Sequence, residues 1–243
     1  MSTMKLLQIT PLVLACAGAL LLTSSEASAA TFKPSDLGGP FDASDDATLD
    51  TVERFGLKHT GTGVDDAAAF LYLEDAGFAP QNSFGIYAAG SPGTTLEVFS
   101  GAATPSFFGK TIRWDDTTGD VCIWSGASCV GAPVNGIDKN NFGFYMKSPQ
   151  GLFTSETALN GDGFDHMVSY FVNGTAGVDY VLGWEDLTGG GDKDYNDMVV
   201  GIHDVVPSNV PSEVVPIPGA VWLLGSALAG LVTVARRQGS VAC

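Results

Sequence analysis

The stretch VDYVLGWEDLTGGGDKDYNDMVVGIHDVV, residues 178–206, places an acidic, glycine-rich segment between two apolar runs. Residues 178–184 and 198–206 are rich in Val, Ile, Tyr and Trp, which favour strands. The glycines at 189–191 let the backbone bend between the two runs. The pattern predicts two strands joined by a long hairpin or by a connection between sheets.

Similar β-prone runs recur along the chain, separated by Gly, Asn, Asp, Ser and Pro. They are SFGIYAA, TTLEVFS, KTIRW, VCIWS, FGFYMK and HMVSYFV. Short strands at this spacing are typical of sandwiches rather than of alternating strands and helices. We expect an all-β, jelly-roll-like antiparallel β-sandwich with its N-terminal part at residues 31–81 and its core at 82–205. One helix is expected at residues 64–77, whose alanines and acidic start also fit an extended lead-in to the first strand.

Two of the runs resemble each other. NSFGIY begins at Asn82, and NNFGFY begins at Asn140. Their separation is too long for a small solenoid repeat. We interpret them as two similar strands of one sandwich, each with a glycine where aromatic neighbours crowd the backbone.

The body of the chain is strongly acidic. Residues 31–216 carry 26 acidic and 8 basic side chains, a net charge of −18 (8 − 26). Such a surface disfavours nucleic acid and anionic lipid as partners and attracts divalent cations.

The segment between the first two runs concentrates this charge, and its basic residue is Lys193. Two like charges about 4 Å apart repel by roughly 4 kcal/mol near a protein surface, so the folded loop needs compensation, and a cation from outside the chain is the first candidate. Asp192, Asp194 and Asn196 alternate like the first ligands of an EF-hand, although the later glycine and the exiting helix are missing. Calcium fits this set better than magnesium, which prefers fewer protein ligands, or zinc, which prefers nitrogen or sulfur. The candidate ligands are Glu185, Asp186, Asp192, Asp194, Asn196 and Asp197. The alternative is a solvated acidic loop capped by backbone hydrogen bonds.

His166 lies next to acidic residues, which raises the question of catalysis. Without a nucleophile elbow or an HExxH motif, we interpret it as a structural hydrogen-bonding residue and do not expect an enzyme. A second interpretation makes Asn160, Asp162 and Asp165 part of a neighbouring metal site.

Cys122 and Cys129 form a pair in CIWSGASC. In an exported chain this spacing predicts a short disulfide loop, which stabilises by about 2.5 kcal/mol through loop-closure entropy. Zinc is not expected, because no second cysteine pair or nearby histidine completes a site.

The two ends of the chain have targeting patterns. Residues 1–30 combine Lys5, an apolar stretch, and small residues at Ala27 and Ala29, which predicts a secretory signal and a mature chain beginning near Thr31. Residues 206–216 form a proline-rich linker. Residues 219–235 lack charge and are just long enough, at about 17 residues, to cross a bilayer.

The tail VPIPGAVWLLGSALAGLVTVARR resembles the C-terminal sorting signal of PEP-CTERM proteins. The resemblance rests on a VPxP sequence and on an apolar helix with a basic end at residues 217–238. The residues that carry it are Val215, Pro216, Pro218, Trp222, Arg236 and Arg237. The sequence departs from that class in having Ile217-Pro218 in place of the Pro-Glu-Pro that names it. The resemblance implies cleavage by an exosortase, a membrane protease-transpeptidase of Gram-negative bacteria that make exopolysaccharide. A plain membrane anchor is the alternative.

The segment WEDLTGGGDKDYNDMVVGI resembles the closing motif of the DUF4114 domain, and NFGFYMKS and LNGDGFDHMVSY fit the same family. The similarity spans roughly residues 82–203. It implies a β-rich fold in an exported setting and no established activity, and it marks the same six acidic and amide residues of the loop.

These patterns predict an exported structural or adhesive protein of the cell surface or extracellular matrix, stabilised by calcium. Its C-terminal helix would hold it transiently in the inner membrane of a Gram-negative bacterium, where an exosortase would process it. The alternative is a calcium-dependent, lectin-like module that binds extracellular polysaccharide. In that case Trp114, Trp124 or Trp184 would form a sugar platform beside the calcium loop.

Overall fold

The computed structural model describes residues 31–49, 51–61, 63–105 and 109–208. The expected secretory signal and the sorting-signal residues from Val215 to Arg237 lie outside these residues. No helix within the described part of the chain is long and apolar enough to cross a membrane.

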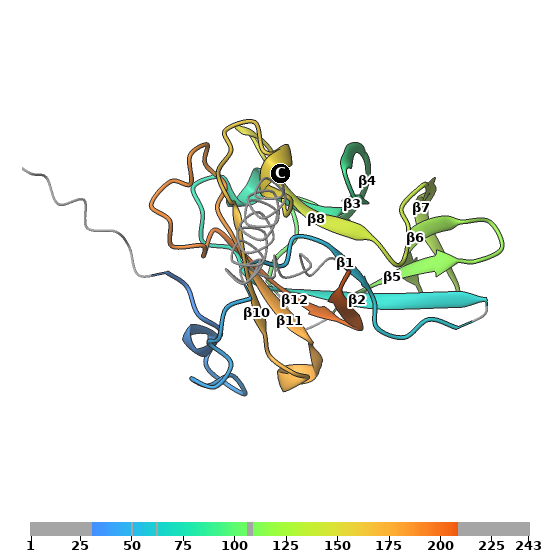
Figure 1. Ribbon diagram of the computed structural model, residues 1–243, viewed down its shortest axis with the longest axis horizontal. Helices are drawn as coiled ribbons and strands as arrows, with labels where there is room; N and C mark the ends of the chain where they lie inside the picture. The colour runs from blue at the N-terminus through green and yellow to red at the C-terminus, as the bar shows by residue number, and fades with distance from the viewer. Residues whose placement is uncertain (1–30, 50, 62, 106–108, 209–243) are drawn as a thin grey trace, which may run out of the picture.

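Two antiparallel sheets form the body, which is consistent with the expected sandwich (Figure 1). The first has the order β13-β1-β8-β3-β4, with β9 paired to β8. Its strands are β1 (Phe55–Leu57), β3 (Ser83–Ala88), β4 (Ser91–Phe99), β8 (Phe142–Ser148), β9 (Gly151–Thr154) and β13 (Val205–Pro207).

The second sheet has the order β10-β11-β12-β2-β5-β6-β7. Its strands are β2 (Val64–Leu73), β5 (Lys110–Asp115), β6 (Asp120–Ser125), β7 (Ser128–Asn135), β10 (Met167–Phe171), β11 (Tyr180–Trp184) and β12 (Met198–His203). Short 3-10 helices connect the strands at Pro34–Leu37, Ala79–Gln81, Thr157–Leu159 and Thr175–Gly177.

The prediction of a helix at residues 64–77 is wrong, because Val64–Leu73 forms the central strand β2. Ala67, Ala69 and Leu71 point into the main core, whereas Phe70 and Tyr72 pack on the opposite face. β2 is hydrogen-bonded to β12 on one side and to β5 on the other. Pairing on both sides and burial on both faces override the helix preference of the alanines.

The two similar sequences form two strands of the body, as predicted, and the structure shows in addition that these strands are neighbours. In the β3–β8 pair, Gly85 lies opposite Tyr145 and Gly143 lies opposite Tyr87. A Cβ atom at Gly143 would lie 2.3 Å from the Tyr87 ring, and one at Gly85 would lie 2.7 Å from the Tyr145 ring. Each glycine therefore leaves room for the tyrosine ring of the other strand.

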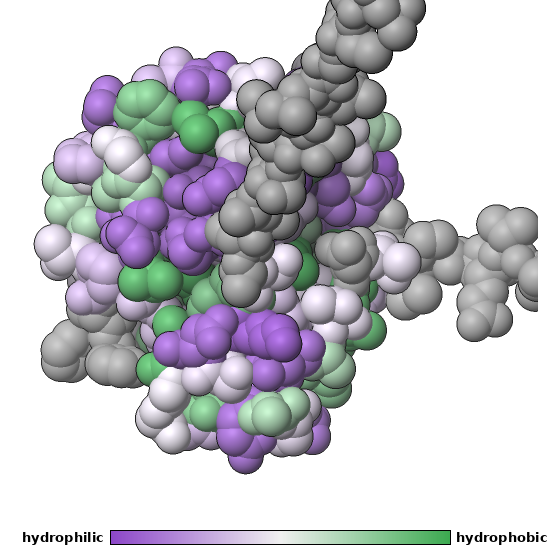
Figure 2. Space-filling view, turned by 90° about the vertical axis from the view of Figure 1, so that its left-hand side faces the viewer, coloured by the Kyte–Doolittle hydropathy of each residue, from purple (hydrophilic) through white to green (hydrophobic). Residues whose placement is uncertain are grey.

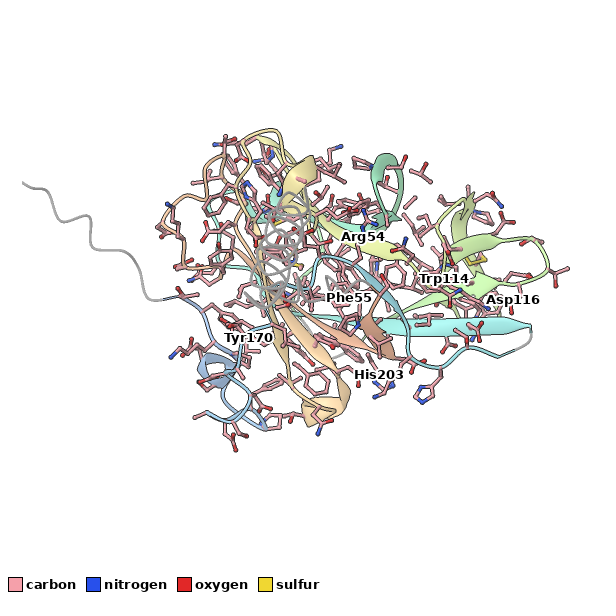
Figure 3. The ribbon with its side chains drawn as sticks, in the orientation of Figure 1. Arg54, Phe55, Trp114, Asp116, Tyr170 and His203 are labelled. Carbon is pink, nitrogen blue, oxygen red and sulfur yellow. A yellow bond between two sulfur atoms is a disulfide. The ribbon has the colours of Figure 1, made fainter. Side chains whose placement is uncertain are left out.

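Residues 31–49 cover the outer face of the second sheet at β10, β11 and β12. Phe32 and Phe41 form a second apolar cluster there with Tyr170, Val181 and Val199. Figure 3 shows Tyr170 beside this N-terminal segment, where its hydroxyl donates a hydrogen bond to the carbonyl of Phe32. The sheet is thus buried on both faces at the end that carries the acidic loop.

The predicted disulfide is confirmed. Cys122 in β6 and Cys129 in β7 are bonded, with a Cα–Cα distance of 5.7 Å. The bond closes the hairpin at the far edge of the second sheet.

Candidate metal centre

The acidic segment joins β11 to β12, two adjacent antiparallel strands in which Leu182 lies opposite Val200. This confirms the predicted strand–loop–strand arrangement, although β11 begins at Tyr180 and β12 ends at His203. The loop is orange and lies at the left of Figure 1. Figure 2 faces that side of the molecule, where hydrophilic residues are spread between smaller apolar areas.

Three of the predicted ligands come together. Glu185, Asp192 and Asp194 each offer a carboxylate oxygen, and these oxygens all lie within 4.8 Å of one another. Glu185 is fully buried at 0% exposure, Asp194 is half-buried and Asp192 is exposed. The cluster therefore reaches from the protein interior to solvent.

The carboxylate of Glu185 is only partly satisfied by the protein. Its Oε1 accepts a hydrogen bond from the backbone N–H of Tyr195 over 2.7 Å. Its Oε2 is buried and has no hydrogen-bond partner in the described residues. A Cβ at Gly191, where φ is +45°, would lie 3.0 Å from that oxygen. Glycine thus fits both the backbone conformation and the space beside Oε2.

The electrostatics of the loop favour an added cation. Burial, followed by repulsion from Asp197, Asp192 and Asp194, raises the pKa of Glu185 to about 7 against the opposing Tyr195 hydrogen bond. Burial also raises the pKa of Asp197 to about 7. A cation among these groups would favour their charged forms.

The basic residue of the loop does not neutralise these charges. The ammonium of Lys193 lies over the Phe164 ring, 5.4 Å from its centre. Among the ion pairs of the described chain, none involves a residue of the 185–197 loop.

Asn196 holds the candidate ligand Asp194 by hydrogen bonds. Its backbone N–H and its Nδ2 donate to the two carboxylate oxygens of Asp194, over 3.2 and 2.7 Å. The EF-hand-like alternation therefore brings Asp192 and Asp194 to the cluster and uses Asn196 to orient Asp194.

Asp186 and Asp197 have different surroundings. Asp197 Oδ2 accepts the backbone N–H of Asp186 over 2.8 Å, and Asp186 Oδ2 accepts Nδ2 of Asn82 over 2.8 Å. Asn82 was not among the sequence candidates, since it lies 104 residues before Asp186 and nothing local links the two.

His166 is a buried structural residue, as interpreted from the sequence. Its Nδ1 bonds to the carbonyl oxygen of Glu185 over 3.0 Å, and its Nε2 bonds to Asp162 Oδ2 over 2.9 Å. The ring stacks on Phe153 with the ring centres 3.8 Å apart. The hydrogen bond from His166 to the carbonyl oxygen of Glu185 holds the backbone of Glu185, whose Oε2 has no partner in the described residues.

The loop before β10 is hydrogen-bonded to the acidic loop. Asp162 Oδ2 accepts the backbone N–H of Gly189 over 2.7 Å. Burial would raise the pKa of Asp162, but hydrogen bonds from Gly189, Phe164 and His166 lower it to about 2. The side chain of Asn160 bonds to Thr154 and Phe164 within its own region, so the structure gives it no role beside Asp162 as a metal ligand.

The three tryptophans do not form a platform beside the loop. Trp114 is 3% exposed and donates to the carbonyl of Ile137, and Trp184 is 0% exposed. Trp124 is half-buried, and the guanidinium of Arg113 covers its ring at 4.2 Å. Trp124 belongs to β6, which β5, β2 and β12 separate from β11. Stacking of a sugar on Trp114 or Trp184 is therefore excluded in this conformation.

Comparison with known proteins supports part of the sequence resemblance. Residues 131–203 match the family model of DUF4114, a domain of unknown function. The match includes the whole acidic loop between β11 and β12, whereas Asn82 and the first sheet's β3 and β4 precede it. No curated protein and no solved structure matches the chain.

Proposed function

We propose that this protein is an exported, jelly-roll-like, calcium-stabilised β-sandwich that serves as a structural or adhesive component of the cell surface or extracellular matrix. The observation that carries the proposal is the buried Oε2 of Glu185, which has no hydrogen-bond partner in the described residues and lies beside two further carboxylates. A buried charged oxygen in this position is costly unless a cation or a proton meets it.

The ligand chemistry favours calcium. Glu185, Asp192 and Asp194 would supply carboxylate oxygens, and water would complete the six to eight oxygens that calcium takes. Zinc prefers nitrogen or sulfur, and both ring nitrogens of the nearby His166 are already hydrogen-bonded. Because Asp192 is exposed, the ion would enter from solvent and bind with the affinity of extracellular modules, about 10⁻⁴ to 10⁻³ M.

Calcium at this position would brace three parts of the molecule. Glu185 directly follows β11, and Asp192 and Asp194 belong to the loop. The carbonyl of Asp194 accepts a hydrogen bond from the backbone N–H of Phe32 over 2.6 Å. The role is mechanical: calcium would fix the loop and the N-terminal segment on the sheet. We propose no enzymatic activity.

Thermal unfolding with and without calcium tests this role. For the full-length chain in detergent, 1 mM calcium at a Kd of about 10⁻⁴ M stabilises by about 1.4 kcal/mol, which raises Tm by roughly 3–5 °C. Asp194→Ala should abolish the shift, whereas Glu97→Gln, an exposed carboxylate in β4, should retain it. The same Tm in chelator and in several millimolar calcium would contradict the proposal.

Export and processing form the second part of the proposal. The Cys122–Cys129 bond is compatible with an oxidising compartment. We propose that an exosortase cleaves the tail, so that mature protein from the surface or medium ends near residues 215–220 and lacks Trp222. Mass spectrometry that finds the intact C-terminus mainly in the inner-membrane fraction would instead favour a plain anchor.

A further inference from the structure

A second unpaired oxygen belongs to Asn82, whose side chain contacts the acidic loop at Asp186. Asn82 is 0% exposed, and its amide is directed at Asp186, to which Nδ2 donates. The other amide atom, Oδ1, is buried and has no hydrogen-bond partner in the described part of the chain. A buried acceptor without a partner destabilises the fold unless a positively polarised group or a cation meets it.

Two carboxylates accompany this amide. Asp186 is 2% exposed, and its backbone N–H donates a hydrogen bond to the carboxylate of Asp197. Neither carboxylate forms an ion pair in the described residues. The hydrogen-bond donors that reach them are neutral amides, so the negative charge stays uncompensated by the protein.

This group uses different oxygens from the cluster of Glu185, Asp192 and Asp194, although Asp197 lies near enough to that cluster to repel Glu185. Successive side chains at a strand end point to opposite faces, and Glu185 and Asp186 follow β11 in this way. The carboxylate of Glu185 meets the backbone of the loop, whereas that of Asp186 meets Asn82 at the start of β3 in the other sheet. The carbonyl of Asp186 also accepts Oγ of Ser148, at the end of β8, over 2.7 Å.

We propose that Asn82, Asp186 and Asp197 hold a second calcium ion at the end of the core, where the acidic loop meets the first sheet. Amide and carboxylate oxygens are the ligands that calcium takes in proteins. The inference rests on the proposed calcium binding of this domain but uses different oxygens. The first ion fixes the loop to its own sheet, and the second joins the loop to the opposite sheet.

Native mass spectrometry and calorimetry on the full-length chain in detergent test the number of ions. The wild-type chain should bind two calcium ions. Asp192→Asn should weaken only the first ion and leave the second, because Asp192 is exposed and belongs to the first cluster. Asn82→Leu should weaken the second ion by about tenfold or more and leave the first. Gln150→Leu, which removes an exposed amide that accepts Thr188 N–H, should retain both.

The possible failures are distinguishable. One ion in the wild-type chain that Asp192→Asn weakens and Asn82→Leu does not, or two ions bound unchanged in Asn82→Leu, would overturn the second site and leave the first. No ion in the wild-type chain would overturn both proposals. If Asn82→Leu does not fold, Asn82→Asp keeps the oxygen and adds a charge, so the second ion should bind more tightly; an unchanged Kd would overturn the second site.

Discussion

At Gly143 the backbone of β8 passes directly under the ring of Tyr87, with 2.3 Å between the ring and the position of a Cβ atom. We predict that Gly143→Ala lowers the free energy of unfolding by about 1–3 kcal/mol, because the ring or the strand must move. Urea denaturation measures the loss. Gly151→Ala is the matched control, since its Cβ would lie 3.8 Å from Phe153, an ordinary contact. Equal stability of the two variants would contradict the explanation.

Glu74 follows β2, and its Oε1 is buried without a hydrogen-bond partner in the described chain. Burial raises its pKa to about 7. A carboxyl whose pKa is raised in the folded state binds more protons there than in the unfolded state. The free energy of unfolding therefore falls as pH rises from about 4.5 to 7. We predict that Glu74→Gln removes this loss and stabilises the calcium-free protein at pH 8, by an amount on the order of 1 kcal/mol.

The measurement for Glu74 is urea denaturation at pH 5 and pH 8 in chelator. Glu97→Gln serves as the control because that side chain is exposed in β4. A variant whose stability exceeds that of the wild type equally at both pH values would show that the ionisation of Glu74 is not the cause.

At the scale of elements, the hairpin of β6 and β7 is closed by the Cys122–Cys129 bond and has β7 as an exposed edge. We predict that replacing both cysteines by serine costs about 2.5 kcal/mol by loop-closure entropy. Urea denaturation of the wild-type chain and of the double serine variant measures this loss. Equal free energies of unfolding for the two proteins would contradict the prediction.

The same elements show what the sequence could predict. The strands around the acidic loop and the glycine positions in β3 and β8 follow from local composition and alternation. The strand β2 does not, because its alanines favour a helix until β5 and β12 pair with it.

The candidate site was predictable to the same extent. Glu185, Asp192 and Asp194 lie in one short segment, and the sequence alone brings them together. Asn82 joins Asp186 only through the packing of one sheet on the other, and residues 31–49 reach β10 in the same way. Contacts of such long range leave no local signal in a single sequence.

At the scale of the whole molecule, each sheet pairs an early strand of the described residues with a late one. β1 pairs with β13 in the first sheet, and β2 pairs with β12 in the second. We predict that a chain ending at residue 208 keeps the fold, whereas a chain ending at residue 197 does not. Near-UV circular dichroism and sharp thermal unfolding distinguish the two; a cooperative transition in the shorter chain would contradict this dependence.

This pairing also determines when folding can happen. The hydroxyl of Tyr170 donates a hydrogen bond to the carbonyl of Phe32, which lies 138 residues earlier in the sequence. Among the described strands, β12 and β13 are made last, and they pair with the first two, β2 and β1. Contacts between residues so far apart in sequence form slowly, because the chain loses the entropy of closing a long loop before the contacts stabilise it. A polypeptide threaded through a membrane with its N-terminus leading would therefore stay unfolded, and free to pass, until β12 and β13 had emerged on the far side.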